Sequence, residues 1–404
     1  MIKYAESLDP KDCCGCEACI QICGHKALTR NLDAEGFIYP IFNREACVNC
    51  HLCEKVCPIE NTEKLLNSVG KAFAVQNKKE RELLDSSSGG VFIAIAKMII
   101  SLDGVVYGAS FDKDMLLRHV RVDKIENLRS LQGSKYVQSD IGNVYKEIRK
   151  DLRDGKRVYF SGTPCQVAGL KLFLFKPFDN LFTTDLVCHG IPSQKVFHTT
   201  IKHMENEKNA KITDYCFRDK RIKGWAIACS AFFSKQNKQF KIKYSKDMEA
   251  YFNAFICGDL MRMSCYQCPF AKHERAGDIT LADFWGARKY TPDFHKIHKG
   301  VSLLIANSEK GRRMLNILSD KFYYEPLDMG IATAKNHNMN APTPITKDRS
   351  YSYTLAFNNY PAFIKKYYKQ NYFISKIKVE AEAFIRSHYA LFLIVSKLKN
   401  LRQG

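Results

Sequence analysis

Eight cysteines near the N-terminus repeat one spacing, in which gaps of two, two and three residues separate four cysteines. The first run consists of Cys13, Cys16, Cys19 and Cys23. The second run consists of Cys47, Cys50, Cys53 and Cys57, and Pro58 follows it. This spacing is typical of bacterial ferredoxins that hold two 4Fe–4S clusters through cysteine thiolates. The runs therefore predict one-electron transfer at the front of the chain.

The order of the cysteines also predicts which thiolates share a cluster. Three cysteines at two-residue gaps can bind three corners of one cube, and the fourth cysteine of each run reaches the other cube. We therefore expect Cys57 to complete the first site and Cys23 to complete the second. A disulfide framework needs an oxidising compartment, and zinc commonly uses two CxxC pairs, so both alternatives fit less well. Cys14 lies outside the spacing and is interpreted as a spare thiol.

Length and composition place these runs in a larger protein. The chain has 404 residues, of which 46% are hydrophobic, so a small domain can be followed by one large or two modest ones. Its apolar runs are shorter than the about 20 residues that a membrane-spanning helix needs. No secretory signal begins the sequence, so we expect a cytoplasmic protein without a transmembrane segment. Sixteen cysteines in a reducing compartment indicate metal or redox chemistry.

The formal net charge of +20 is unevenly distributed. Residues 1–70 contain 7 Lys and Arg against 10 Asp and Glu, so the basic excess lies in the remainder of the chain. A basic body suits anionic cofactors and acidic redox partners. The basic stretches lack the signature of a nucleic-acid-binding fold, so nucleic acid is not expected as a partner. The expected partner is a redox protein or a small-molecule electron donor or acceptor.

After a polar linker at 61–70, the pattern changes to alternating strands and helices. Strands are predicted at 72–75, 104–111, 157–160, 181–187 and 278–285. Helices are predicted at 89–102, at 143–154 and from Gln166 onwards. This alternation indicates an α/β or α+β body.

Four cysteines of the body stand where metal chemistry is plausible: Cys165, Cys188, Cys265 and Cys268. Cys165 opens a predicted helix, where the helix dipole favours a thiolate, and Cys188 ends a predicted strand. Cys265 and Cys268 form a CxxC pair that cannot complete a four-ligand site alone. Spacing alone leaves two interpretations open, a third metal site or two buried thiols beside a zinc or redox CxxC. Cys216, Cys229 and Cys257 are expected in the core.

Several polar loops could contact a phosphate or a cofactor ring. The stretch 85–90, Asp-Ser-Ser-Ser-Gly-Gly, precedes a predicted helix, where free amides suit a phosphate. A serine N-cap explains most such stretches equally well. The segments 133–139 and 217–220 carry cations in similar loops, and each alone is more commonly a solvated turn.

Together, these segments occur in the order found in one family. The ordered motifs are residues 86–90, 135–139, 161–166, 187–193, 265–268 and 277–286. With them, the chain resembles the coenzyme F420 hydrogenase/dehydrogenase beta-subunit family over about residues 1–320. The resemblance implies an α+β fold, with a mixed α/β flavin-binding body joined to a small N-terminal two-cluster bacterial ferredoxin-like domain. It implies domains at 1–62 and 70–325. The remaining residues, 326–404, are basic and aromatic, and we expect them to form a helical extension.

The resemblance also implies cofactors and their ligands. It makes Cys165, Cys188, Cys265 and Cys268 the ligands of a third 4Fe–4S cluster in a body that also binds FAD. The implied flavin-contacting residues are Ser87, Ser88, Gly89, Gly90, Lys135, Tyr136 and Gln138. In such enzymes electrons pass between clusters and FAD, and the two-electron substrate is often coenzyme F420.

Two further predictions concern the reaction. A reduced flavin ring is anionic, so a cation at its edge would assist, and Lys135 is the first candidate and Arg218 the second. The extension after residue 325 is not explained by the resemblance. It could touch a partner or a membrane surface, but a basic helix packed on the body is the favoured interpretation. A different class of function also stays open, a non-catalytic iron–sulfur relay subunit of a larger redox complex.

Overall fold

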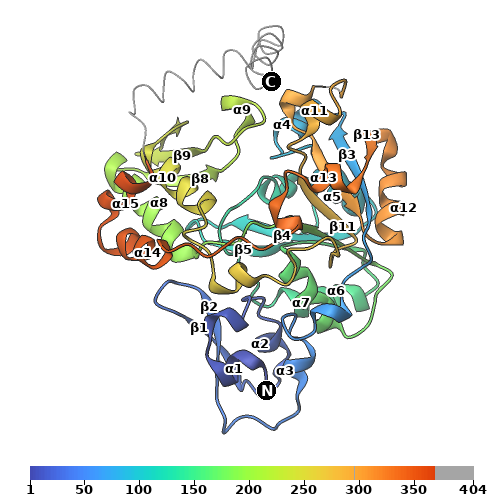
Figure 1. The fold of residues 1–404 in the computed structure, drawn as a ribbon, viewed down its shortest axis with the longest axis vertical. Coiled ribbons are helices and arrows are strands. Elements are labelled where there is room, and N and C mark those ends of the chain that lie inside the picture. Colours follow the sequence, from blue (N-terminus) through green and yellow to red (C-terminus); the bar gives the residue numbers. More distant parts are fainter. Residues whose placement is uncertain (295, 369–404) are drawn as a thin grey trace.

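The computed structural model describes residues 1–294 and 296–368. The N-terminal part lies at one end of the molecule, below a larger body built on an eight-stranded sheet (Figure 1). A two-stranded sheet belongs to the N-terminal part, and a three-stranded sheet lies in the body beside the main one.

The N-terminal part is a set of short elements joined by the two cysteine loops. Its elements are α1 (Lys3–Ser7), a 3-10 turn (Pro10–Asp12), α2 (Ala18–Ile22), β1 (Leu28–Leu32), β2 (Ile38–Phe42) and α3 (Leu52–Lys55). Strands β1 and β2 pair antiparallel. The two loops share one backbone conformation: φ is positive at Gly15 and Glu17 in the first run, and at Asn49 and His51 in the second. The cysteine spacing is therefore a structural duplication as well as a sequence repeat.

The main sheet is mixed, with a parallel centre. Its order is β13-β3-β12-β11-β7-β6-β4-β5. The strands are β3 (Lys71–Asn77), β4 (Val105–Phe111), β5 (Leu117–Val122), β6 (Val158–Ser161), β7 (Leu181–Leu186), β11 (Ile279–Asp283), β12 (Ser302–Ala306) and β13 (Phe322–Leu327). Neighbours among β4, β6, β7 and β11 are parallel, and the flanking pairs are antiparallel. The sequence-predicted strands are confirmed, with ends shifted by no more than a few residues.

Helices cover both faces of this sheet because alternate strand residues are apolar on each side. On one face, α5 (Val91–Ser101) and α12 (Glu309–Ile317) share a core with Val106 and Tyr159. On the other, α6 (Val144–Arg153) and α7 (Pro164–Leu174) share a core with Tyr107 and Phe160. Short helices α4 (Glu80–Leu84) and α11 (Ala287–Tyr290) lie near the loops that follow β3 and β11. This is the expected mixed α/β body.

The second half of the body packs around its own apolar core. It contains α8 (Gln194–Lys208), β8 (Lys211–Cys216), α9 (Lys220–Lys223), β9 (Ser230–Lys235), β10 (Lys238–Ile242) and α10 (Lys246–Ile256). Helices α13 (Met329–Thr333), α14 (Arg349–Asn358) and α15 (Tyr360–Tyr367) follow β13. The extension expected at 326–404 is thus helical over much of 326–368, and the remainder of that expectation lies outside the described residues. The boundary expected at 325 falls inside β13, which pairs with β3.

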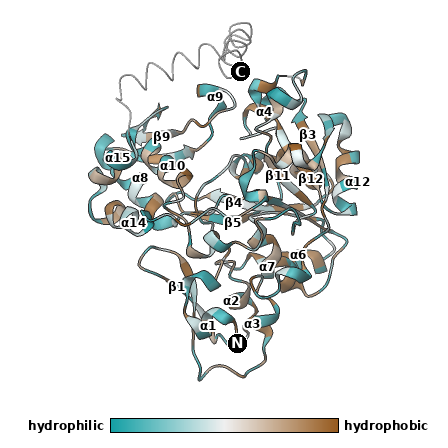
Figure 2. Cartoon of the chain, in the orientation of Figure 1, coloured by the Kyte–Doolittle hydropathy of each residue, from teal (hydrophilic) through white to brown (hydrophobic). Residues whose placement is uncertain are grey.

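The N-terminal part and the body share hydrophobic cores. Cys16, Ala18 and Val56 pack with residues of α6 and α7, and Phe37 and Tyr39 pack with residues of α8, α10, α14 and α15. Apolar residues alternate with hydrophilic ones along helices such as α12 (Figure 2). No helix in the described ranges is long and apolar enough to cross a membrane.

Candidate functional site

The eight cysteines of the two runs line two separate cavities. The first cavity is lined by Cys13, Cys16, Cys19 and Cys57, together with Cys14. The second is lined by Cys23, Cys47, Cys50 and Cys53. Each cavity thus takes three cysteines from one run and the fourth from the other, which is the grouping expected from the spacing. Four thiols around one cavity form the donor set that a 4Fe–4S cluster requires.

The first cavity lies against helix α7 of the body. Gly169 of α7 packs so closely on Cys16 that a Cβ at this glycine would lie 3.1 Å from the Cys16 Sγ. The Tyr145 amide, at the start of α6, donates to Gln21 Oε1 (3.1 Å). The Ile141 amide donates to Glu17 Oε1 (3.0 Å), so α2 is fixed to the body by hydrogen bonds as well as apolar contact.

Cys165 begins the same helix α7, one turn before Gly169. Thr163 caps the helix through a capping box with Gln166, and Pro164 occupies its first turn. The cap directs the chain sharply from β6 into α7, and the Thr163 hydroxyl lies 3.2 Å from the Cys165 Sγ. Because four residues of helix span about 6 Å, Cys165 lies close to the first cavity. The strand–turn–helix expected here from the sequence is confirmed.

The other three body cysteines come from two loops that pair with each other. Cys188 follows the end of β7, and Cys265 and Cys268 flank the end of a 3-10 turn (Met263–Gln267). The Arg262 amide donates to the Ile191 carbonyl (3.0 Å), which joins the loops. Gly190 permits this approach, since its φ is +126° and a Cβ there would lie 2.2 Å from the Met261 sulfur.

In the structure, the four body cysteines lie close enough for their charges to shift one another's pKa values. Burial, followed by the charges of Cys165 and Cys268, raises the pKa of Cys188 to about 12. Burial and the charges of Cys188, Cys268 and Cys165 raise the pKa of Cys265 well above its usual range. Burial and Cys165 raise the pKa of Cys268 to about 11. Such crowded thiols become thiolates only beside a positive group, and iron bound by all four would supply that charge.

Cys14 has a position that the sequence did not reveal. Its thiol is hydrogen-bonded to Cys16 of the first cavity and to Cys165 of the body site. The hydrogen bond to Cys16 and burial raise its pKa well above the usual range. Cys14 therefore lies between two cysteine sites, and its interpretation as a spare thiol stays a prediction. The spacing could not indicate this, since Cys165 is far away in sequence.

The loops expected to contact a flavin partly converge. The Ser134 amide donates to Ser87 Oγ (2.7 Å), so the loops at 86–90 and 133–137 touch. Arg218 Nη1 donates to the Tyr136 hydroxyl (3.3 Å), and Arg218 Nη2 lies 3.5 Å from the Ser87 carbonyl oxygen. Gln138 instead faces the first cysteine loop, where a Cβ at Gly15 would lie 2.6 Å from its Nε2. Gly89 is held against the main sheet, with its amide donating to Ser302 Oγ (2.8 Å).

Two buried cations, Arg218 and Lys220, lie at this convergence, and a third cation, Lys135, lies in one of its loops. Arg218 is 4% exposed and forms an ion pair with Asp283 (2.8 Å). Lys220, also 4% exposed, donates to the carbonyl oxygens of Leu83 (2.8 Å) and Ser88 (2.5 Å), and burial lowers its pKa well below the usual range. Lys135 donates to two loop carbonyls, and burial lowers its pKa to about 8. Within the described residues, Lys135 and Lys220 form no carboxylate ion pair, so an anionic group such as a pyrophosphate or a reduced flavin fits here.

Motifs named from the sequence contain further side chains at this place that were not predicted as site residues. Trp225 and Trp285 stack with ring centroids 5.3 Å apart, and the Trp225 indole donates to Asp283 Oδ1 (2.7 Å). Asp283 ends β11 and Cys188 follows β7, so both lie at the carboxyl edge of parallel strands, where ligands commonly bind in such sheets. The expectation that Cys257 lies in the core was wrong, because it caps the end of α10 and is exposed, whereas Cys229 is buried.

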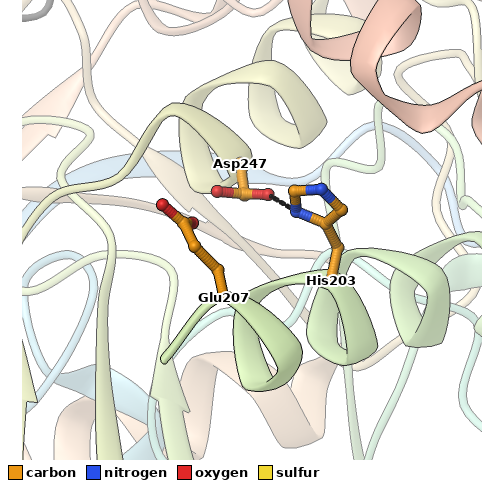
Figure 3. A group of neighbouring side chains, drawn as sticks. All are labelled: His203, Glu207 and Asp247. Carbon is orange, nitrogen blue, oxygen red and sulfur yellow. Dashed lines mark hydrogen bonds and ion pairs between the residues drawn. The ribbon is translucent and has the colours of Figure 1, made fainter. Parts of the chain in front are cut away.

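A separate group of polar side chains lies between α8 and α10. Figure 3 shows His203 and Glu207 from α8 beside Asp247 of α10. One potential ligand atom from each residue lies within 4.8 Å of the others, and the His203 Nδ1 is 2.6 Å from Asp247 Oδ1. Lys208 and Lys246 also pair with Glu207. These lysines supply the positive charge that the carboxylate needs, so the group is explained as an ion-pair network.

Comparison with known proteins agrees with this architecture. Residues 155–329 match the family model that describes the C terminus of the beta subunit in coenzyme F420 hydrogenase/dehydrogenase. Ferredoxin-3 of Nostoc sp. is 31% identical over 70 residues, covering 14% of this chain and 72% of that protein. The F subunit of the F420H2 dehydrogenase from Methanosarcina mazei is 24% identical over 185 residues, covering 42% of this chain. The match spans about half of that relative, 51% of its length.

Among solved structures, a chain of the F420-reducing NiFe hydrogenase complex from Methanosarcina barkeri aligns with 68% of this chain and 91% of its own length. The TM-score is 0.43 and the sequence identity is 14%. The family model covers residues 155–329 of the body, and the ferredoxin relative matches a short part of the chain that fits the paired cysteine runs. The body therefore carries the C-terminal region of the coenzyme F420 hydrogenase/dehydrogenase beta-subunit family at residues 155–329, and the chain has an iron–sulfur ferredoxin-like part at its N-terminus.

Proposed function

We propose that this protein is an iron–sulfur flavoprotein oxidoreductase that passes electrons between its ferredoxin-type clusters and a two-electron donor or acceptor through FAD. The observation that carries the proposal is the contact of Cys14 with both Cys16 and Cys165. It brings the first ferredoxin cavity next to the four scattered body cysteines. Electron transfer falls off steeply with distance, so adjacent sites favour a continuous path over two independent metal sites.

The cysteines have separate tasks in this proposal. Cys13, Cys16, Cys19 and Cys57 would hold the cluster nearest the body, and Cys23, Cys47, Cys50 and Cys53 the outer one. Cys165, Cys188, Cys265 and Cys268 would hold the third. When bound, 4Fe–4S clusters supply one-electron transfer, and FAD supplies the exchange between one-electron and two-electron transfer. The thiolates hold each site in place, and the shared cores keep the sites from separating.

The converging loops supply the chain's own contribution at the flavin. Lys135, Arg218 and Lys220 provide positive charge for the pyrophosphate or for the anionic reduced ring, which requires no proton transfer from the protein. The same converging loops contain the other proposed flavin-contacting residues, Ser87, Ser88, Gly89, Gly90 and Tyr136. Gln138 is a weaker candidate for flavin contact, because it faces the cysteine loop. Asp283 holds Arg218 in position through its carboxylate.

The two-electron substrate is proposed as coenzyme F420. The matching family bears that coenzyme in its name, and so does the F420H2 dehydrogenase relative, which this chain matches over about half of that relative's length. A redox partner protein at the ferredoxin end would supply or remove single electrons. A cytoplasmic location agrees with this chemistry.

Anaerobically purified full-length protein tests the proposal. We expect a yellow flavin that is released as FAD, and about 12 iron atoms per chain, at four per cluster. Protein without flavin and with only about 8 iron atoms, by the same count, would contradict it and favour a relay function without catalysis. Mixing dithionite-reduced protein with coenzyme F420 and following the F420 absorbance then tests the substrate.

A further inference from the structure

Arg262 connects the first ferredoxin site to the body site through one residue. Its backbone belongs to the body loops, because its amide donates to the Ile191 carbonyl and its carbonyl accepts from the Cys265 amide (both 3.0 Å). Its side chain extends into the ferredoxin part, where Nε donates to the Cys13 carbonyl oxygen (2.7 Å). Nη2 donates to the Ile38 carbonyl oxygen (2.9 Å). The guanidinium therefore lies between two of the proposed cluster sites.

This guanidinium is completely buried, and its positive charge has no carboxylate partner among the described residues. Arg262 is 0% exposed, and its Nη1 has no hydrogen-bond partner. In the residues that the structure describes, no ion pair joins it to Asp or Glu. Arginine stays protonated in proteins, so this charge cannot be removed by losing a proton. A buried charge of this kind needs an anion nearby.

The ring of Tyr39 covers one side of the guanidinium, with its centroid 3.9 Å from the Arg262 Cζ. A cation–π contact stabilises a buried cation, although it does not neutralise the charge. On the cysteine side, a Cβ at Gly15 would lie 2.8 Å from Nη1, so a side chain at Gly15 would displace the guanidinium. The open hydrogen-bonding atom thus faces the loop that carries Cys13 and Cys16.

Cysteines that interact with Arg262 can carry the missing negative charge. Burial lowers the pKa of Arg262, but the charges of Cys13, Tyr39, Cys14 and Cys265 outweigh burial and raise it above its usual value. These cysteines belong to both sites or lie between them. Clusters held by four thiolates are net anions, so two such clusters would supply the counter-charge.

A second buried arginine in the same region has its positive charge balanced by a carboxylate. Arg275 is 1% exposed and forms an ion pair with the buried Asp185 (3.3 Å). It also donates to the carbonyl oxygens of Phe270 (2.7 Å) and Leu186 (2.6 Å). Arg275 is therefore satisfied by protein groups alone, whereas Arg262 lacks a carboxylate and has one unused donor atom.

We propose that Arg262 is a positioning residue whose positive charge raises the reduction potential of two clusters. These are the inner ferredoxin cluster, at the cavity of Cys13, Cys16, Cys19 and Cys57, and the body cluster, at Cys165, Cys188, Cys265 and Cys268. A fixed positive charge favours the more anionic, reduced form of each cluster. The hydrogen bonds of the guanidinium go to Cys13 and Ile38, and not to the loop of the outer ferredoxin site, which is lined by Cys23, Cys47, Cys50 and Cys53. This inference rests on the proposed function, because it requires a cluster at each of the two sites.

Redox titrations of full-length protein, followed by electron paramagnetic resonance, test this role. We expect Arg262→Gln to lower the equilibrium constant for reduction of two clusters about tenfold, which is 59 mV for a one-electron couple. The potential of the outer ferredoxin cluster should not change. Arg262→Lys retains the charge and should keep all three within about threefold, or roughly 30 mV. Arg312→Gln removes an equal charge from the exposed surface of α12 and should change nothing.

Two results would overturn the role of Arg262. The first is an Arg262→Gln protein with three unchanged potentials, and the second is an equal shift of all three. If Arg262→Gln does not fold with its full iron content, Arg262→Lys decides: unchanged potentials support the shared charge, and a tenfold fall contradicts it. Failure of the proposed function is seen separately, as a missing body cluster in the wild-type iron count and spectra.

Discussion

The ferredoxin-like part and the body assemble cysteine sites in opposite ways. In the first, eight cysteines lie within residues 13–57, and two loops of the same backbone conformation position them. In the body, four cysteines are spread over residues 165–268, and the ends of β6 and β7 and a loop after α10 bring them together. A local run can be identified by spacing, whereas a dispersed site depends on the packing of the whole sheet. The two kinds of site should therefore respond differently to mutation.

Removing one of the four body cysteines should have the largest effect. It should remove the body cluster and leave the clusters of the ferredoxin-like part intact. We expect Cys265→Ser to lose about 4 of about 12 iron atoms per chain, because one missing thiolate opens the body site. The signals of both ferredoxin clusters should remain, while electron passage from reduced clusters to flavin should stop. Iron analysis, paramagnetic resonance and rapid mixing measure these effects.

The exposed Cys257 provides the matched control for this experiment, since it lies outside all three cysteine groups. Cys257→Ser should keep all of its iron and its electron transfer. A Cys265→Ser protein that also kept all of its iron would contradict the assignment of a cluster to the body cysteines.

Breaking the contact between the two regions should have the next largest effect. Arg349 of α14 donates from Nη1 (2.8 Å) and Nη2 (2.5 Å) to the carboxylate of Glu35 in the ferredoxin hairpin, and from Nε to the Met261 carbonyl (2.9 Å). Arg349→Met should lower the free energy of unfolding by about 2 kcal/mol, the range for hydrogen bonds to charged groups. Anaerobic urea unfolding measures this loss.

A double-mutant cycle sharpens that measurement. If Arg349 and Glu35 stabilise the protein mainly through each other, Glu35→Gln should cost much less once Arg349 is already Met. Additive losses would show that the C-terminal helices do not hold the hairpin through this pair. Arg313→Met, on the exposed side of α12, serves as the surface control.

Close packing between the regions predicts a smaller loss. At Gly169, a valine would be forced against Cys16, and overpacking of this kind typically costs about 1–3 kcal/mol. Urea unfolding of Gly169→Val should show that loss, together with a changed signal from the inner ferredoxin cluster. Gly24 is the matched glycine, because nothing lies within 4 Å of a Cβ there. Equal stability of Gly24→Val and Gly169→Val would contradict the tight contact.

The smallest predicted effect concerns pH at the converging loops of the body. Burial lowers the pKa of Lys135 to about 8, so its charge is lost as the pH rises through that value. FAD should therefore bind about threefold more weakly at pH 9 than at pH 7, within the limit that one proton sets. Fluorescence titration of apoprotein with FAD measures this, and Lys135→Gln should remove the dependence.

The stability of the flavin-free protein should change in the opposite direction. Between pH 8 and 10.5 the unfolded chain keeps the Lys135 proton that the folded chain has released, so this residue makes folding more favourable as the pH rises. FAD affinity that stayed constant with pH in wild-type protein would show that the charge of Lys135 does not contribute to FAD binding.

The sequence alone determined the features that depend on nearby residues. The cysteine spacing fixes which thiols can share a cavity, since loops of a few residues have few conformations. The apolar periods fixed the strands and helices of the main sheet, including the turn from β6 into α7. The order of motifs indicated the family, and with it the four dispersed cysteines.

Only the tertiary structure decided how these parts meet. Nothing near Cys14 indicates that its thiol contacts Cys165, and nothing near Arg262 indicates that its charge lies between two cysteine sites without a carboxylate. The same is true of Arg349, which gives the C-terminal helices a task in holding the ferredoxin hairpin. Burial and charge balance depend on groups that are hundreds of residues apart in sequence, and packing of the complete chain brings them together.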